Sequence, residues 1–317
     1  STHCISSAAS DVYKRQIDGS EYSKNAIDFV ASRTTVLGNN PTIELLNIQV
    51  PLPARASRLV GREALDRYYE EEADKVFTSA RKVLKRDNIT VTEAYRIGAP
   101  DEMIAQEADK LPADLIVMGS RGLTALKGLI MGSVTTGVLA RTKCPVLLLR
   151  GKEAPLTDAL RVGIAVDGSK YGMAAVNHVL KGIDFFGKGA QFYLINVVND
   201  YAGAVMPDMA GMALPALSES EVLELQKKEF AETVDPLRPL FEKAGLKPTE
   251  VCLVGNPSDE IAAFAKKNKL DLIVMGSHGY TRFKSAVMGS TATHIAAEGN
   301  VPLLIIRAAD DEAAPKA

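Results

Sequence analysis

Two motifs built from glycine and serine carry the clearest chemical information in this chain. Each has the order Gly-x-x-Gly, nine residues, Gly-Ser. The motif residues are Gly119, Gly122, Gly132 and Ser133 in the first copy, and Gly276, Gly279, Gly289 and Ser290 in the second. A glycine lacks Cβ, so phosphate oxygens can approach its backbone N–H closely. Each Gly-Ser pair also opens a predicted helix, whose free N–H groups and partial positive charge favour an anion. The motifs therefore predict two phosphate-binding sites.

These glycines have a second interpretation, as turn and helix-cap residues that serve no ligand. The spacing is unchanged between the two copies although several residues between the glycines differ. This favours a shared ligand, and the purely structural interpretation remains the alternative.

Charged and polar side chains accompany the glycines in both copies. Asp18 and Asp167 each precede a Gly-Ser pair. Their carboxylates could accept hydrogen bonds from ribose or adenine, or hold a metal-bound phosphate. Capping of the next helix is the alternative role. Arg121 and His278 occupy the same position inside the two glycine loops, where either could contact phosphate.

The motifs belong to a long internal repeat. Residues 114–133 and 271–290 share thirteen of twenty aligned residues at a separation of 157 positions. Asp18 and Asp167 are only 149 positions apart, so the second copy carries eight extra residues. We place them in the loop around residues 206–215. A period of this length indicates a duplicated domain.

Each copy alternates predicted strands and helices. In the second copy the predicted strands are residues 161–166, 191–198, 249–254, 270–275 and 301–306. The predicted helices are 171–181, 219–243, 258–268 and 290–298. Pro236 and Pro239 should break or kink the second of these. The alternation predicts an α/β fold, with a mainly parallel sheet and helices on both faces.

The first copy follows the same order and contains a long predicted helix, about 62–86. Apolar residues at helical spacing predict its buried face. They are Leu65, Tyr69, Val76, Ala80 and Val83.

The first sixteen residues do not fit the repeat. The second copy opens on an apolar strand, whereas residues 1–16 read STHCISSAASDVYKRQ. We predict that this segment is foreign to the domain, with a naturally degenerate strand as the alternative.

Composition limits the classes of partner. Hydrophobic residues make up 46% and charged residues 24% of the 317 residues, as in ordinary globular proteins. A net charge of −2 gives no reason to expect nucleic acid or an anionic membrane as partner. Three cysteines without ligand spacing fit a reducing, cytoplasmic compartment. The four histidines form no metal-ligand pattern, and no apolar run approaches the roughly 20 residues of a membrane helix.

At the glycine motifs the chain resembles the universal stress protein family in its tandem form. The resemblance runs from about residue 17 to 307 and implies two Rossmann-like domains, each with five parallel strands. Family members with this motif typically bind ATP. The resemblance places adenine near Asp18 and the backbone of Ile48, and near Asp167 and Val197 in the second copy. It places ribose and phosphates at the motif glycines and serines.

One departure from the family concerns the residue two positions before the aspartate. The family usually has proline there, whereas this chain has Gln16 and Ala165. Gln16 also lies in the doubtful opening segment, which makes the first adenine pocket the weaker of the two.

The predicted organisation is a doubtful segment 1–16, domains at 17–151 and 152–307, and a disordered tail at 308–317. The family dimerises through its last strand. The resemblance therefore implies that residues 145–149 and 302–306 pair within one chain as a pseudo-dimer. Further homo-oligomerisation stays open.

The predicted function is ATP binding with a conformational or signalling output in a stress response. ADP or AMP could replace ATP, and Mg²⁺ could accompany it. No P-loop and no α/β-hydrolase elbow occurs, and no catalytic residue is assigned. A slow ATPase and a nucleotide-stabilised, chaperone-like scaffold are the alternatives.

Overall fold

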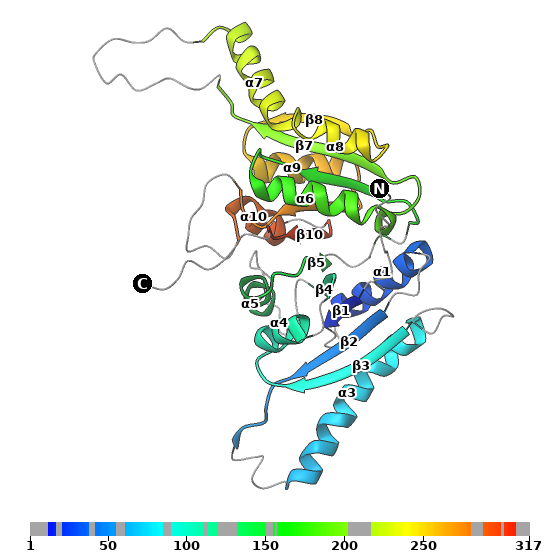
Figure 1. Cartoon of the computed structure of the whole chain (residues 1–317). Helices are drawn as coiled ribbons and strands as arrows, with labels where there is room; N and C mark the ends of the chain where they lie inside the picture. The colour runs from blue at the N-terminus through cyan, green and yellow to red at the C-terminus, as the bar shows by residue number, and fades with distance from the viewer. Residues whose placement is uncertain are drawn as a thin grey trace, which may run out of the picture. The chain divides into compact units, whose positions relative to one another are not determined.

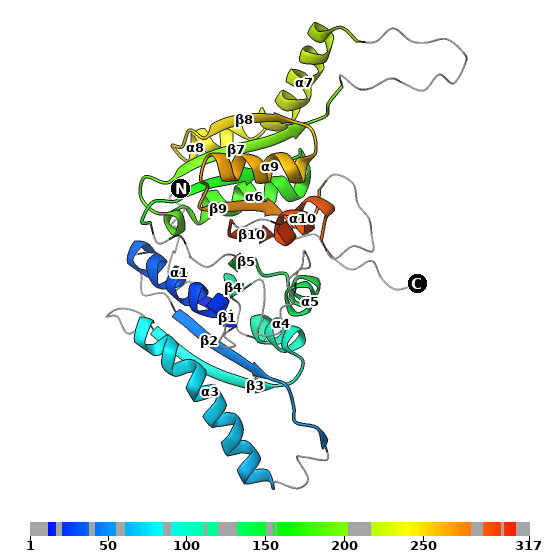
Figure 2. The same cartoon turned by 180° about the vertical axis from the view of Figure 1, so that it is seen from behind.

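The computed structural model describes most of the chain. The described residues are 12–16, 21–37, 42–54, 61–84, 90–110, 113–119, 132–149, 155, 157–201, 217–279, 288–298 and 301–308. They divide into two compact units. Unit 1 is Ser1–Asp158 with Asp184–Lys188, and unit 2 is Ala159–Ile183 with Gly189–Ala317. Figure 1 and Figure 2 show the elements of each unit from opposite sides.

Unit 1 contains a parallel sheet. Its strands are β1 (Val12–Gln16), β2 (Thr42–Gln49), β3 (Thr90–Ile97), β4 (Leu115–Gly119) and β5 (Val146–Leu149). Their order is β3-β2-β1-β4-β5, and all neighbouring pairs are parallel. The chain thus moves outward from β1 to β3 and then returns to the other side of β1. Because parallel crossovers are right-handed, this reversal sends the later helices to the opposite face.

The helices of unit 1 follow that rule. Helix α1 (Glu21–Leu37) packs with α3 (Arg62–Leu84), and α4 (Pro100–Lys110) packs with α5 (Ser133–Arg141). Figure 1 and Figure 2 both show α4 and α5 side by side. The sheet therefore has helices on both faces, as the sequence predicts.

Unit 2 repeats this arrangement. Its strands are β6 (Arg161–Ala165), β7 (Gln191–Val198), β8 (Thr249–Val254), β9 (Leu272–Gly276) and β10 (Leu303–Ile306). The order β8-β7-β6-β9-β10 is again parallel throughout. The helices are α6 (Lys170–Lys181), α7 (Glu219–Val234), α8 (Arg238–Lys243), α9 (Pro257–Lys267) and α10 (Ser290–Glu298). A short 3-10 helix, η1 (Ile183–Phe186), follows α6, and all of it except Ile183 belongs to unit 1. The predicted fold, two tandem Rossmann-like domains, is confirmed.

Prolines divide the long helix of unit 2. Helix α7 ends at Val234, a turn follows, and Pro239 lies in the first turn of α8. Pro236 stands in that turn and has no N–H to continue the helical hydrogen bonds. The predicted break is therefore confirmed. In unit 1 the corresponding helix α3 is continuous.

The buried face of α3 differs in part from the predicted one. Tyr69 and Ala80 are buried as predicted, but Leu65, Val76 and Val83 are only partly buried. The remaining buried positions are Ala73, Phe77 and Leu84. Packing against the sheet therefore buries a face of α3 that is rotated from the face predicted by the spacing of its apolar residues.

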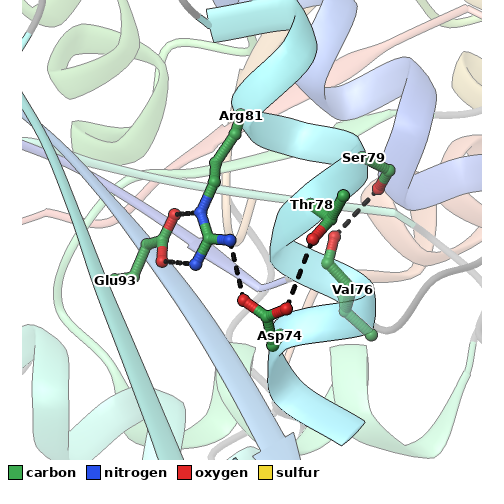
Figure 3. A network of polar contacts seen from close by, with 6 residues as sticks. All are labelled: Asp74, Val76, Thr78, Ser79, Arg81 and Glu93. Atoms are coloured by element: carbon green, nitrogen blue, oxygen red, sulfur yellow. Dashed lines mark hydrogen bonds and ion pairs between the residues drawn. The ribbon is translucent and has the colours of Figure 1, made fainter. Parts of the chain in front are cut away.

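Ion pairs fasten helix α3 to the edge strand β3. Arg81 donates from Nε and Nη2 to both carboxylate oxygens of Glu93, at 2.8 and 2.6 Å. Its Nη1 donates to Asp74 at 2.7 Å, as Figure 3 shows. The same pair of hydrogen bonds recurs 157 residues later, where Arg238 on α8 donates from Nε and Nη2 to the carboxylate of Glu250 on β8. The two hydrogen bonds from this guanidinium lower the pKa of the Glu250 carboxyl.

The polar opening segment forms the central strand of unit 1. Strand β1 lies between β2 and β4, with Gln16 in register with Leu46 and Arg15 with Val117. The foreign origin of residues 1–16 stays a prediction, because a foreign peptide and a degenerate native strand could occupy this place equally. Residues 1–11 and 309–317 lie outside the described residues.

Replacing Val12–Gln16 with Arg-Val-Gly-Ile-Ala, the β6 sequence at the same repeat position, should stabilise unit 1. Strands of a parallel sheet covered on both faces are normally continuous apolar runs, and charged groups there carry a desolvation cost. We expect a gain of at least about 1 kcal/mol, which is roughly 2–4 °C for a unit of this size. Differential scanning calorimetry with the two transitions resolved would measure it.

The reciprocal exchange is the matched control. Placing Val-Tyr-Lys-Arg-Gln at Arg161–Ala165 should lower the transition of unit 2 and leave unit 1 unchanged. An unaltered first transition in the forward exchange would contradict the prediction.

Candidate functional site

Each sheet has a topological switch point at the carboxyl ends of two strands. In unit 2 it lies between β6 and β9, because β6 leads outward to β7 whereas β9 leads to β10 on the other side. Ligands of open α/β sheets bind in the crevice at such a point. The corresponding point of unit 1 lies between β1 and β4.

The predicted site residues of unit 2 all surround its switch point. They are Asp167 after β6, Val197 on β7, Gly276, His278 and Gly279 at the end of β9, and Gly289 and Ser290 at the start of α10. In unit 1, the structure describes Ile48 on β2, Gly119 ending β4, and Gly132 and Ser133 at the start of α5. Asp18, Arg121 and Gly122 lie outside the described residues.

In the turn after β6, the residue that caps the following helix is not the aspartate. Ser169 caps α6, since its Oγ accepts a hydrogen bond from Gly172 N–H at 3.2 Å. Asp167 Oδ1 accepts from Ser169 N–H at 3.1 Å. Gly168 between them has φ of +76°, the left-handed region that favours glycine. Helix capping therefore belongs to Ser169, and Asp167 shapes the turn that carries its carboxylate.

The same carboxylate reaches the glycine loop across the switch point. A Cβ atom at Gly279 would lie 2.7 Å from Asp167 Oδ2, closer than such atoms can approach. Gly279 therefore leaves room for the Asp167 carboxylate beside the loop that follows β9. The approach places a carboxylate beside backbone that the sequence assigns to phosphate and ribose.

Gly276 has a packing role that the motif alone did not indicate. A Cβ atom there would lie 2.5 Å from Cβ and 2.7 Å from the carbonyl carbon of Tyr171. Gly276 thus lets helix α6 approach the end of β9 closely. This agrees with the structural interpretation of that glycine.

The start of α10 is tied to the glycine loop. Gly289 N–H donates to the carbonyl of Ser277 at 2.8 Å, and Gly289 O accepts from Thr293 N–H at 2.9 Å. A Cβ atom at Gly289 would lie 3.3 Å from His278 Cα. The N-terminus of α10 therefore lies beside the loop that follows β9, as a shared phosphate site requires.

Helix α5 in unit 1 begins in the same way. Gly132 O accepts from the N–H and the hydroxyl of Thr136, at 3.0 and 3.2 Å. Gly289 O accepts in the same manner from Thr293 in unit 2, with both bonds at 2.9 Å. The two motifs thus share the local geometry of their third glycine.

His278 is held on one side of the glycine loop. Its Nδ1 lies 3.1 Å from Ser277 Oγ, and its ring centroid lies 5.2 Å from that of Tyr171. Lys170 Nζ lies 5.3 Å from the centroid of the same tyrosine ring. The ionisable side chains of His278 and Lys170 therefore both lie near the ring of Tyr171.

Val197 presents its backbone polar groups to the crevice. Ile195 O accepts from Val166 N–H, so the polar groups of Ile195 point toward β6. Val198 O accepts from Gly255 N–H on the opposite side. Since backbone groups alternate sides along a strand, Val197 points toward β6 again, at a level beyond the last β6 residue, Ala165.

The Val197 N–H and C=O have no hydrogen-bond partner among the described residues of β6 and the turn that follows it. Ile48 has the same orientation in unit 1. Gly98 N–H donates to Gln49 O on the β3 side, so the Ile48 groups face β1. The backbone N–H and C=O of Val197 and those of Ile48 therefore point in equivalent directions in the two units.

Sequence reasoning did not assign Ser277, Tyr171 or Asn196 to the site. The sequence could have identified each of them, because the other copy of the repeat has an identical residue at the equivalent position. These equivalents are Ser120, Tyr22 and Asn47. Identity between the two copies outside the glycines therefore marked residues that shape the site.

The universal stress protein family model matches residues 16–150 and 160–307. The chain belongs to the universal stress protein family. Its two halves each correspond to one family domain, as the internal repeat predicts.

Similar proteins match this chain either over about half of its length or over nearly all of it. A universal stress protein of Methanocaldococcus jannaschii is 32% identical over 46% of this chain and 81% of its own length. A universal stress protein of Mycolicibacterium smegmatis is 24% identical over 92% of this chain and 95% of its length. The crystal structure of one from Archaeoglobus fulgidus has a TM-score of 0.66 at 20% identity, covering 94% of this chain and 98% of that one.

The described residues contain neither a membrane-spanning helix nor a cluster of metal-binding side chains. No helix in them is long and apolar enough to cross a membrane. Likewise, no three His, Cys, Asp or Glu side chains in these parts of the chain are grouped to hold a metal ion.

Gly276→Ala should destabilise unit 2 although it adds one methyl group. The new Cβ would meet the backbone of Tyr171, which cannot move aside as a flexible side chain could. Overpacking of this kind costs about 1–3 kcal/mol, and we expect the upper part of that range. Urea denaturation of both proteins would measure the difference.

Gly182→Ala is the matched control, because its Cβ would have an ordinary 3.5 Å contact with the His178 carbonyl. Equal unfolding midpoints for Gly276→Ala and Gly182→Ala would show that the close packing of α6 on β9 is dispensable.

Proposed function

We propose that each domain binds an adenine nucleotide, with ATP as the principal ligand, and that binding controls a conformational output in a stress response. The observation that carries the proposal is the pair of backbone groups at Val197, beside Asp167 and the glycine loop. A matching pair stands at Ile48 in the first domain.

The backbone pair suits adenine in particular. Adenine N1 accepts a hydrogen bond and its 6-amino group donates one, so one residue's N–H and C=O can satisfy both. Guanine presents the reverse order on that edge, a donor at N1 and an acceptor at O6. The same backbone residue would leave both of its polar groups unsatisfied by guanine, which costs about 1–3 kcal/mol for each buried group.

Asp167 suits the ribose. Its carboxylate lies between the turn after β6 and Gly279. An acidic side chain at a nucleotide site of this fold class accepts hydrogen bonds from ribose hydroxyl groups. The first domain has Asp18 for the same role.

The glycine loop and the N-terminus of α10 suit the phosphates. Gly289 ties the two together, and Ser290 is an exposed first helical residue whose hydroxyl can donate. Free N–H groups at a helix N-terminus favour anions. His278, and Arg121 in the first domain, would add a hydrogen bond or a positive charge. A Mg²⁺ ion would arrive with the nucleotide.

Nucleotide occupancy of each domain can be tested separately with Gly289→Val and Gly132→Val. Native mass spectrometry of the purified wild type should show two adenine nucleotides for each chain. Each variant should hold one and the double variant none, because a side chain replaces the space required at the helix N-terminus. In titrations, GTP should bind at least tenfold more weakly than ATP.

Folding must be controlled, since a Cβ at Gly289 also approaches the His278 backbone. Circular dichroism and the unfolding midpoint of each variant provide that control. Unchanged occupancy in the folded double variant would refute the proposed sites. Sustained phosphate release by the wild type would favour an ATPase instead of a binding protein.

A further inference from the structure

We propose that Asn196 is a positioning residue that keeps the backbone N–H of Val197 available for the ligand. It does so by occupying the carbonyl of Val166, which would otherwise be the partner of that N–H. The inference has a structural half, that Asn196 keeps the Val197 N–H unpaired, and a ligand half, that this N–H then binds the ligand. The ligand half rests on the proposed function, whereas the structural half does not.

At the end of β6, a side-chain donor takes the place of a backbone donor. Val166 N–H donates to Ile195 O at 2.9 Å, a regular rung of the parallel ladder. The next rung would join Val197 N–H to Val166 O. Instead, Asn196 Nδ2 donates to Val166 O at 2.9 Å, and no bond joins these two described residues, Val197 and Val166. A side chain has thus replaced a backbone donor.

The orientation of the Asn196 amide is determined by that bond. Turning the amide over would place Oδ1 against the Val166 carbonyl, and two acceptors cannot share a hydrogen bond. Oδ1 therefore points away from Val166, and within the described chain it has no partner. The side chain is only 4% exposed.

A buried acceptor without a partner destabilises the folded state, because the loss of its hydrogen bonds to water is not compensated. An apolar residue at position 196 would avoid this cost and would let the ladder continue by one rung. Asparagine is therefore not the most stable residue for this position. Its role is to interrupt the hydrogen-bond ladder between β6 and β7. Polar groups that are costly to the fold are expected where a site needs them.

The first domain carries the same arrangement of residues. Asn47 precedes Asn196 by 149 positions, is 5% exposed, and directly precedes Ile48. Strand β1 ends in register with Leu46, as β6 ends in register with Ile195. In both domains a buried asparagine thus directly precedes the residue whose backbone we propose to contact adenine.

Asn196→Leu tests the structural half through hydrogen exchange of the Val197 amide, measured by NMR on the full chain without nucleotide. In the wild type this amide should exchange rapidly. In the variant Val197 N–H should bond to Val166 O, and its exchange should slow at least tenfold. The unfolding midpoint of unit 2 should stay equal or rise, because a buried unpaired oxygen is removed.

The ligand half is tested by ATP titration of Asn196→Leu in the Gly132→Val background, which leaves one site. Affinity should fall at least tenfold relative to Gly132→Val alone. Asn47→Leu in the Gly289→Val background is the matched control and should weaken the first site in the same way. Asn196→Ala removes the donor without adding bulk, so its affinity should fall as well.

The outcomes separate this inference from the proposed function. Slow exchange of Val197 in the wild type, or unchanged exchange in Asn196→Leu, would overturn the positioning role. Full ATP affinity in both Asn196→Leu and Asn196→Ala would overturn it too. A wild type that binds no nucleotide would refute the proposed function, while the exchange measurement would still decide the role of Asn196.

Discussion

Strand β6 stops at Ala165, whereas its neighbour β7 continues to Val198. The chain after β6 turns into α6, so the last backbone groups of β7 on that side have no strand beside them. That difference in length leaves the Val197 backbone groups available for the proposed ligand. It also places Asp167 in the turn after β6 and allows Asn196 to donate to the carbonyl of Val166. The remaining features of the site are arranged around this unpaired stretch of β7.

Three motif glycines of unit 2 allow close contacts around its switch point. Gly276 brings α6 against β9, Gly279 brings the turn after β6 against the glycine loop, and Gly289 brings α10 against the same loop. The motif glycines of unit 2 therefore serve the fold. The structural interpretation of these residues and the proposed phosphate role are not exclusive, because the packing that needs each glycine also leaves its backbone exposed to close approach.

The two domains share the hydrogen bonding of their third motif glycine but differ in their central strand. Strand β6 is apolar after its first residue, whereas β1 carries Lys14, Arg15 and Gln16 between two neighbouring strands. Because β1 precedes Asp18 closely in the sequence, its polar residues concern the adenine end of the proposed first site more than its phosphate end. Gly132 and Thr136 retain the geometry seen at Gly289 and Thr293.

The sequence by itself determined the duplication, the parallel α/β fold and the position of the glycine loops. These follow from local periodicity and from identity between the copies, which need no knowledge of long-range contacts. It also located the break near Pro236, because the missing N–H is a local property. The tertiary structure decided which face of α3 is buried, since the sheet beneath it selects that face. It alone revealed the Gly276–Tyr171 contact and the Asn196–Val166 bond, because both depend on how far separate strands extend beside one another.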